Sequence, residues 1–429
     1  MKLHWQILIA LLLAVLAGLA SGVEADLFGL RFYDVYVFIG NLFLNALKMI
    51  IVPLVVSSII VGIAGIGSSR AFGRLGGRTL MYYLATTFIS VTIGLLVVNA
   101  LTPGIQDGQP VKDVLNLSAD VSSITAKVEG RGVSDVVEVF LRMVPPNIVA
   151  AAADGQMLGL IFFSLLFGFF MSRVGEPHAE NLYGFWAGVY EVMLRITLFI
   201  MRFAPIGVFG LVARVVADTG ASRFFDLMEV LGLFFLSVIL ALAIHMFVVM
   251  PLILRYVAGV NPLRHYRAMA PALLTAFSTA SSSATLPLTL ECVEKNAGVS
   301  NRTSSFVLPL GSTVNMDGTA LYECVAAMFI AQAYGLDLSF TQQFVIVLLA
   351  LVTSIGVAGV PAASLLAITI ILGYMGLPVE GIALIYVVDR LLDMCRTAVN
   401  VFSDSCGAVV IGRLEGEEAI LAEDRPNIV

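Results

Sequence analysis

The sequence predicts an all-α polytopic membrane protein with eight transmembrane helices and two re-entrant helical hairpins. Of its 429 residues, 59% are hydrophobic and 13% are charged, which is typical of a polytopic membrane protein rather than of a soluble domain with one anchor. Eight apolar runs are long enough to cross a hydrocarbon core of about 30 Å: 4–23, 34–66, 79–102, 156–173, 185–216, 225–254, 304–334 and 382–412. Two further apolar stretches, 270–293 and 345–376, are interrupted by small polar residues, glycine and proline, and we expect broken or re-entrant helices there.

The first run is expected to be a full span rather than a cleaved secretory signal, because its length suits a bilayer and a whole membrane protein follows it. The basic residues of the loops predict how the chain is oriented across the membrane. They follow the second, fourth and sixth runs and precede the seventh, at Arg70, Arg74, Arg78, Arg173, Arg255, Arg264, Arg267, Lys295 and Arg302. These loops are predicted to be cytoplasmic, as are both termini. We therefore expect a multi-pass plasma-membrane protein, in the cell inner membrane if the source is bacterial.

The connecting segments add little chemistry. Residues 103–140 are largely polar and are predicted to form an extracytoplasmic loop. The net charge of -6 gives no indication of nucleic-acid binding. The cysteines lack the spacing of a metal site, so we expect them to be small packing residues: Cys292, Cys324, Cys395 and Cys406.

The second half of the chain contains one arrangement twice. The interrupted stretch 273–290 precedes a helix with polar residues at 311–323, and the interrupted stretch 352–368 precedes another at 388–406. We interpret this pattern as related structural halves, of the kind found as inverted repeats in transporters, whose binding sites lie near mid-membrane where broken helices meet. From the interruptions alone, a pair of kinked ordinary helices remains an alternative.

The segment 388–406 is the most informative part of the sequence. At 100° per residue its polar residues fall within an arc of roughly 100°. They are Asp389, Asp393, Arg396, Thr397, Asn400 and Asp404. A charge at bilayer depth costs at least ~2.5 kcal/mol, so such residues face a bundle interior or an aqueous cavity and usually mark a substrate or ion path.

A second polar group interrupts the run 304–334, at Gly311, Asn315, Asp317, Gly318 and Thr319. Asn315 and Asp317 do not share a helical face, so a locally unwound backbone is predicted. Their oxygens suit a hard cation rather than a transition metal. Because carboxylates are few and the ion must be released in every cycle, a monovalent ion such as sodium is favoured.

At this point the chain resembles the dicarboxylate/amino acid:cation symporter family, which includes archaeal aspartate transporters and animal glutamate and neutral amino acid transporters. Four motifs carry the resemblance, in the family's order and spacing: STASSSATLP, NMDGTALYE, SIGVAGVP and DRLLDMCRTAVNVFSD. The resemblance implies a homotrimer whose protomers work independently by an elevator mechanism, with the second hairpin as the outer gate.

The resemblance also implies a division of the chain. Scaffold helices 1 and 2 occupy residues 1–78, and scaffold helices 4 and 5 occupy 141–218. Helix 3 of a mobile transport domain occupies 79–102, and the loop 103–140 follows it. The rest of the transport domain, with helices 6, 7 and 8 and both hairpins, occupies 219–429.

The implied substrate is aspartate or glutamate. By resemblance, Arg396 grips the side-chain carboxylate and Asp393 the ammonium group. Asn400 and the backbone near Ser282 take the α-carboxylate, Thr319 and Thr397 line the site, and Val360 closes it. Family members for neutral amino acids replace the arginine and dicarboxylate carriers lack the aspartate, whereas both residues are present here.

Three sodium sites are implied, and no other cofactor. The first combines Asp404 with carbonyls of Gly311, Asn315 and Asn400. The second combines Tyr83, Thr86, Thr87, Asn315 and Asp317. The third consists of carbonyls of Thr313, Ser354, Ile355 and Val357, and closes only when the second hairpin shuts, which offers a rationale for coupling.

The coupling ion stays open in two respects. Asp404 favours sodium, since proton-coupled bacterial relatives often carry asparagine there. Glu323, however, stands where animal glutamate transporters have a proton-carrying glutamate, and it is either such a carrier or a hydrogen-bonded structural residue. Relatives also place an arginine at positions that here are Ala280 and Met394.

Other function classes fit less well. A membrane hydrolase using one of Ser281 to Ser283 would need a base, and none of the four histidines lies in a hydrolase motif. His245 is interpreted as a helix-packing residue. An ion channel would need a filter-like repeat, and none is visible. The alternative within the transporter class is a proton-coupled glutamate symporter or a C4-dicarboxylate symporter.

Overall fold

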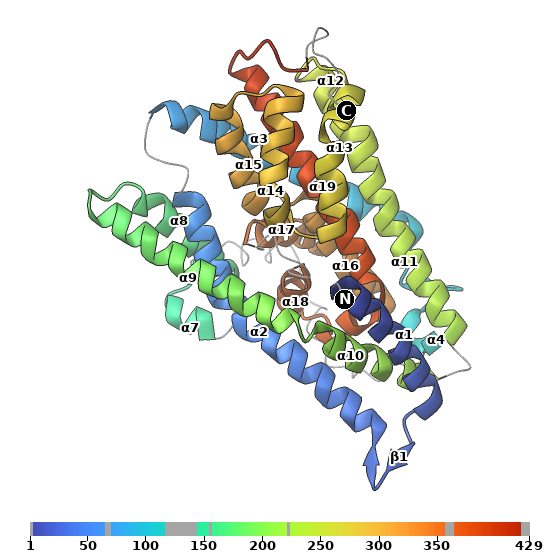
Figure 1. Cartoon of the computed structure of the whole chain (residues 1–429). Coiled ribbons are helices and arrows are strands. Elements are labelled where there is room, and N and C mark those ends of the chain that lie inside the picture. Colours follow the sequence, from blue (N-terminus) through green and yellow to red (C-terminus); the bar gives the residue numbers. More distant parts are fainter. Residues whose placement is uncertain are drawn as a thin grey trace.

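The computed structural model describes residues 3–64, 70–115, 144–153, 157–220, 224–356 and 364–421, most of which lie in helices (Figure 1). The predicted all-α class is thus confirmed for these ranges. Two described stretches are long and apolar enough to span a membrane, Leu75–Leu101 and Asp226–Tyr256, judged by length and composition alone. The count of eight spanning helices stays a prediction.

The N-terminal helices pack on one another (Figure 1). A short hairpin of β1 (Asp26–Leu27) and β2 (Leu30–Arg31) joins the first two helices. The helices of this group are α1 (Leu3–Ser21), α2 (Phe32–Ala64), α7 (Ile148–Ala153), α8 (Met157–Met171), α9 (His178–Met201) and α10 (Ala204–Thr219). At Gly210 an added Cβ would lie 2.8 Å from the Tyr36 carbonyl oxygen, so α10 and α2 approach backbone to backbone.

The apolar run 185–216 is not one helix. Helix α9 ends at Met201 and α10 begins at Ala204, with Pro205 in its first turn. Proline has no N–H and its ring clashes with the carbonyl four residues earlier, so a helix breaks before it and restarts with it near position N1. Pro205 therefore suits the start of α10, but a proline alone does not make the break, because α2 continues through Pro53.

The second helix group contains α3 and the C-terminal half (Figure 1). Its larger members are α3 (Arg70–Leu101), α11 (Phe224–Ile244), α12 (Met250–Tyr256), α13 (Pro262–Thr279), α14 (Ser282–Glu291), α15 (Asn301–Val314), α16 (Asp317–Ala333), α17 (Phe340–Gly356), α18 (Ser364–Met375) and α19 (Ile382–Leu414). Two π-helical turns, η2 (His245–Val249) and η3 (Cys292–Ala297), and the 3-10 turn η4 (Val379–Gly381) complete it.

The start of the predicted loop 103–140 is ordered against this group. It forms the strands β3 (Ile105–Gln106) and β4 (Gln109–Pro110) and the short helix α4 (Val111–Leu115). The rest of that loop lies outside the described residues.

Two of the helix breaks that the sequence predicted lie among the described residues, and both are present. Helices α13 and α14 are separated by Ala280, in the left-handed region at φ 50°, and by Ser281, whose Oγ accepts a hydrogen bond from the Ala284 N–H at 3.2 Å. Helices α15 and α16 are separated by Asn315 and Met316, which have non-helical dihedral angles, so the unwound backbone is confirmed. Residues 357–363, which connect α17 to α18 in the predicted second hairpin, lie outside the described residues.

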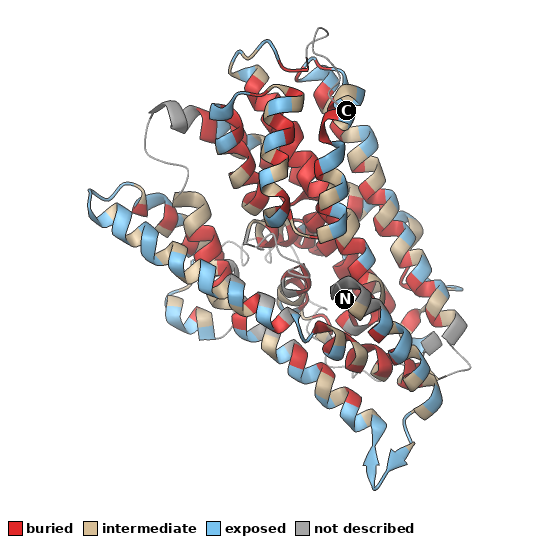
Figure 2. Ribbon diagram, in the orientation of Figure 1, coloured by how far each residue is buried: buried red, intermediate tan, exposed pale blue. Residues whose placement is uncertain are grey.

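Helix α16 forms the centre of the second group. All of its residues except Gln332 are buried, and it packs against α3, α11, α17, α18 and α19 (Figure 2). A helix that is apolar on all sides is stable only when it is enclosed. By contrast, α9 exposes large apolar side chains such as Phe185 and Phe199. The few polar residues of α16 are therefore held in the least hydrated part of the protein.

Candidate functional site

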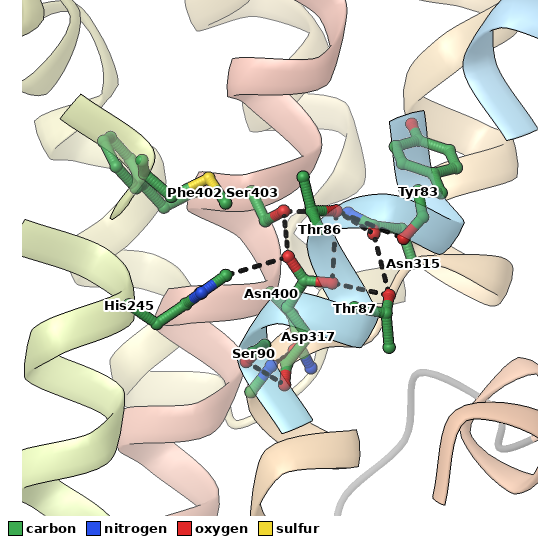
Figure 3. Close-up of polar contacts among 12 residues, drawn as sticks. Tyr83, Thr86, Thr87, Ser90, His245, Asn315, Asp317, Asn400, Phe402 and Ser403 are labelled. Carbon is green, nitrogen blue, oxygen red and sulfur yellow. Dashed lines mark hydrogen bonds and ion pairs between the residues drawn. The ribbon is translucent and has the colours of Figure 1, made fainter. Parts of the chain in front are cut away.

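The first polar cluster surrounds the carboxylate of Asp317, at the start of α16 (Figure 3). Thr87 Oγ1 donates to Asp317 Oδ1 at 2.6 Å and Thr86 Oγ1 does so at 3.4 Å. Ser403 Oγ donates to the other oxygen, Oδ2, at 2.6 Å. Ser90 Oγ donates to the Asp317 backbone carbonyl at 2.9 Å. Helices α3, α16 and α19 therefore meet at one buried carboxylate.

Asn315 joins this cluster to a second carboxylate, Asp404. Its Nδ2 donates to Asp404 Oδ1 at 2.9 Å and to Ser403 Oγ at 3.1 Å. Its Oδ1 faces the hydroxyls of Thr86 and Thr87 at 3.4 and 3.5 Å. The unwound backbone between α15 and α16 lets this side chain reach α3 on one side and α19 on the other.

Gly311 lies directly beside Asp404 and Tyr83. A Cβ added at Gly311 would be 2.5 Å from Asp404 Oδ1 and 2.6 Å from Tyr83 Oη. The Tyr83 hydroxyl donates to the Val307 carbonyl at 2.8 Å. The residues predicted for the first two sodium sites are thus brought together, with the exception that Asn400 lies in the next cluster.

Asn400 caps the start of α16. Its Oδ1 accepts hydrogen bonds from the N–H groups of Gly318 and Thr319 at 2.8 and 3.3 Å, and its Nδ2 donates to Thr319 Oγ1 at 2.9 Å. At Gly318 an added Cβ would lie 2.7 Å from the Arg396 carbonyl, so only glycine permits this approach of α16 to α19.

Arg396 is completely buried on α19. Its Nη2 lies 3.0 Å from Asp393 Oδ1 and 3.2 Å from Asp389 Oδ1, and its guanidinium lies 3.8 Å from the centre of the Tyr322 ring. Among the described residues, its Nε and Nη1 have no hydrogen-bond partner. A buried guanidinium with spare donors is a strong binding group for a carboxylate.

Asp393 lies between two arginines. Besides Arg396, Arg390 Nη1 approaches its Oδ2 at 3.3 Å. Thr397 donates its hydroxyl to the Asp393 backbone carbonyl at 2.8 Å. The polar face predicted for α19 therefore exists as a buried charge network, in which two arginines balance Asp389 and Asp393.

The remaining predicted residues are less closely joined. Ser282 is buried in the first turn of α14. The hydroxyls of Thr313 and Ser354 donate back into their own helices, to the carbonyls of Leu310 and Leu351 at 3.0 Å each. Ile355 packs against a cluster of buried apolar side chains. Val357 and Val360 lie outside the described residues.

Glu323 lies on α16 and is fully buried. Thr353 Oγ1 donates to its Oε2 at 2.8 Å, and within the described part of the chain its Oε1 has no hydrogen-bond partner. One hydrogen bond compensates a buried carboxyl only in part.

One residue at the site was not predicted from the sequence as functional. His245, interpreted as a packing residue, has its Nε2 2.9 Å from Asp317 Oδ2, and both side chains are fully buried (Figure 3). The available signal was an ionisable residue within the apolar run 225–254, which is uncommon at bilayer depth and usually functional.

Comparisons with known proteins agree with the predicted resemblance. A family model described as "Sodium:dicarboxylate symporter family" matches residues 3–414. The chain is 37% identical to the proton/glutamate-aspartate symporter of Escherichia coli, over 96% of this chain and 93% of that protein. It is 36% identical to the proton/sodium-glutamate symport protein of Geobacillus stearothermophilus, over 97% and 95%. It is also 36% identical to mouse excitatory amino acid transporter 3, over 97% and 86%.

These matches cover nearly the whole length of the chain and include all the helices that build the clusters described above. Members of the family are membrane transporters and not enzymes. This protein belongs to the sodium:dicarboxylate symporter family.

Proposed function

We propose that this protein is a sodium-coupled symporter of acidic amino acids, L-aspartate or L-glutamate. The observation that carries the proposal is the buried Arg396, whose Nε and Nη1 are unused within the described chain while Asp393 lies 3.0 Å from its Nη2. The relatives named above include transporters of glutamate and aspartate.

In the proposed complex, opposite charges on the protein and the amino acid orient the substrate. Arg396 binds the side-chain carboxylate and Asp393 binds the ammonium group, because each offers the opposite charge in a dry site. Asn400 and the backbone near Ser282 hold the α-carboxylate, Thr319 and Thr397 line the site, and Val360 closes it. A C4-dicarboxylate has no ammonium group, so Asp393 disfavours it.

Sodium binds at two clusters of oxygen ligands and at a third set of backbone carbonyls, which the second hairpin closes. Asp317, Thr86, Thr87 and Asn315 supply carboxylate, hydroxyl and amide oxygens, with Tyr83 beside them. Asp404 supplies the second carboxylate, with carbonyls of Gly311, Asn315 and Asn400. Carbonyls of Thr313, Ser354, Ile355 and Val357 form the third site. Hard oxygen donors of this kind suit an alkali or alkaline-earth ion.

The proposed mechanism is an elevator within a homotrimer in the plasma membrane, with both termini cytoplasmic. Residues 1–78 and 141–218 form the scaffold, and residues 79–102 and 219–429 form the transport domain. The most extensive helix contacts lie within each group, which supports this division, since a body that moves as a unit needs its closest contacts within itself.

A specific observation favours proton coupling as the second candidate. Glu323 is fully buried and has one hydrogen bond, from Thr353, in the described chain. A carboxyl in this environment is more stable when it is neutral, so it suits a proton carrier. The Escherichia coli relative is named as a proton symporter.

The test is uptake of radiolabelled L-aspartate into proteoliposomes at fixed membrane potential, under an inward sodium gradient or an inward proton gradient. We expect accumulation under the sodium gradient alone. Arg396→Cys should lower uptake by about 30-fold or more, because it removes one member of a buried charge network. Arg31→Cys is the matched control, since Arg31, in the exposed hairpin outside the predicted spans, pairs with Asp34 at 2.9 Å and should matter little.

The alternatives give different results. Uptake driven by protons without sodium, and abolished in Glu323→Gln, would replace sodium coupling by proton coupling. The isosteric glutamine can still accept a hydrogen bond from Thr353, so the variant tests protonation rather than packing. Equal uptake by wild type and Arg396→Cys would contradict the substrate assignment.

A further inference from the structure

His245 contacts the proposed sodium site without belonging to the residues assigned to substrate or ions (Figure 3). It is the first residue of η2, the π-helical turn between α11 and α12. Single π-turns within α-helices are rare and occur frequently at functional sites. This turn brings a side chain of the α11–α12 helix into a cluster otherwise built by α3, α16 and α19 and by the break before α16.

The two carboxylate oxygens of Asp317 have different partners. Oδ2 is bound by His245 Nε2 at 2.9 Å and by Ser403 Oγ at 2.6 Å. Among the residues that the structure describes, the partners of Oδ1 are the hydroxyls of Thr86 and Thr87. A hydroxyl can rotate and offer a lone pair to a cation, whereas a ring N–H can only donate. Oδ2 is therefore the anchored oxygen, and Oδ1 is the oxygen available to a cation.

The contacts of the two ring nitrogens indicate where the ring hydrogen lies. His245 Nδ1 is buried and has no hydrogen-bond partner among the described residues. A ring hydrogen on Nε2 fits the 2.9 Å contact with Asp317 Oδ2, because the carboxylate oxygen can only accept. The ring then donates to Asp317 and leaves the negative charge of the carboxylate available to sodium.

We propose that His245 is a positioning residue for sodium at Asp317. This inference rests on the proposed sodium coupling. The ring holds the carboxylate in the rotamer that turns Oδ1 toward Thr86 and Thr87. Because the hydrogen bond of His245 goes to Asp317 at the proposed sodium site, its loss changes the sodium dependence of the protein and not its affinity for aspartate at saturating sodium.

The experiment is a sodium titration of the purified full-length protein without amino acid, read as the sodium-dependent rise in unfolding temperature at constant ionic strength with choline. His245→Met keeps the approximate size and removes the donor, and His245→Gln keeps a donor amide. We expect His245→Met to raise the half-saturating sodium concentration about tenfold, as for the loss of one hydrogen bond to a charged group. His245→Gln should restore most of this loss.

A matched control is available on α13. His265 is also fully buried, and its Nε2 lies 2.9 Å from Ser405 Oγ, a neutral partner. His265→Met makes the same chemical change away from Asp317 and should leave the sodium titration unchanged. Half-saturating aspartate concentrations at saturating sodium should match the wild type in all folded variants.

Two results would overturn the inference: an unchanged sodium midpoint in His245→Met, or equal shifts in both methionine variants. If His245→Met does not fold, His245→Asn makes the same test, because its shorter side chain places the amide out of reach of Asp317. A wild type with no sodium response would refute the sodium coupling itself, and the inference would fall with it. That result differs from one in which wild type and variant respond alike.

Discussion

Asn315 lets two carboxylates coexist in one dry cluster. An amide carries an acceptor and a donor on the same group, and here Nδ2 faces Asp404 while Oδ1 faces Thr86 and Thr87. A carboxylate at this position would face Asp404 with like charge, at a cost that rises in a medium of low dielectric. The asparagine thus separates two anionic groups, each of which can receive its own cation.

Gly311 is the residue at which the smallest change should be most damaging. In Gly311→Ala the new Cβ would lie 2.5 Å from Asp404 Oδ1 and 2.6 Å from Tyr83 Oη. Neither atom can yield freely, because Asn315 holds the first and the Val307 carbonyl holds the second. Overpacking of this kind costs about 1 to 3 kcal/mol. We expect sodium-driven uptake to fall at least tenfold, measured as initial rates in proteoliposomes.

The control for this prediction is Gly232→Ala. Gly232 lies within α11, and an added Cβ there meets no atom within 4 Å. Alanine is favoured over glycine inside a helix by roughly 0.5 to 1 kcal/mol. Unchanged uptake in Gly311→Ala would show that Asp404 and Tyr83 have room to move and do not form a tight ion site.

At the scale of elements, the end of α19 is tied to the start of α15. Glu417 Oε1 accepts hydrogen bonds from Ser300 Oγ and Thr303 Oγ1, both at 2.6 Å, and its Oε2 accepts from the Ser300 N–H at 2.8 Å. A carboxylate at a helix N-terminus is also favoured by the helix dipole. The segment after α19 therefore closes over the end of α15 that is predicted to face the cytoplasm.

This contact predicts a pH-dependent contribution to stability. Partial burial alone raises the pKa of Glu417, but the hydrogen bonds from Ser300 and Thr303 outweigh it and hold the pKa below its ordinary value. A lowered pKa in the folded state means that the stabilisation is complete above the ordinary value of about 4.3 and is lost as the pH falls through the folded value. We expect Glu417→Gln to lower Tm by about 2 °C at pH 7.

The difference in Tm between the variant and the wild type should begin to shrink as the pH falls below the ordinary value of about 4.3, and it should vanish only below the lowered folded value. Thermal unfolding in detergent across this pH range measures the difference. Glu418→Gln is the control, because that neighbouring side chain is exposed. A difference between Glu417→Gln and wild type that is constant with pH would contradict the ionised contact.

The elements also show what the sequence could predict. The break at Asn315 was predicted because its signal is local, a polar pair that cannot share a helical face. The break before Pro205 is local as well, but an apolar run conceals it when hydropathy alone is considered. The contact of His245 with Asp317 joins residues 72 positions apart. Such a contact depends on the depth and rotation of α11 against α16, which periodicity alone does not determine.

At the scale of the whole molecule, the two helix groups meet at several helix pairs, among them α10 with α19 and α2 with α15. A Cβ added at Gly62 on α2 would lie 3.6 Å from Thr313 Oγ1 on α15. A disulfide needs Cβ atoms about 3.5 to 4.5 Å apart. Oγ1 is the one atom of Thr313 within 4 Å of the added Cβ, so the two Cβ atoms lie beyond 4 Å, and cysteines at these positions can be joined after a small relaxation of the two helices. Such a bond would tie the proposed scaffold to the proposed transport domain.

If transport requires one helix group to move against the other, oxidation must stop transport by the double variant Gly62→Cys, Thr313→Cys. We expect its uptake to fall to the level of protein-free liposomes after oxidation and to recover on reduction, while each single variant is insensitive to the oxidant. Of the native cysteines, Cys292, Cys324 and Cys406 are buried, whereas Cys395 is partly exposed, so all of these variants carry Cys395→Ser. A second pair, Gly412→Cys with Ile420→Cys, joins two positions inside the transport domain, where an added Cβ at Gly412 lies 2.7 Å from Ile420 Cδ1. Oxidation of that pair should leave uptake intact, because a bond within one rigid body does not restrain its travel. Continued uptake by the oxidised Gly62 and Thr313 pair, with the crosslink verified by mass spectrometry, would refute the proposed division into scaffold and transport domain.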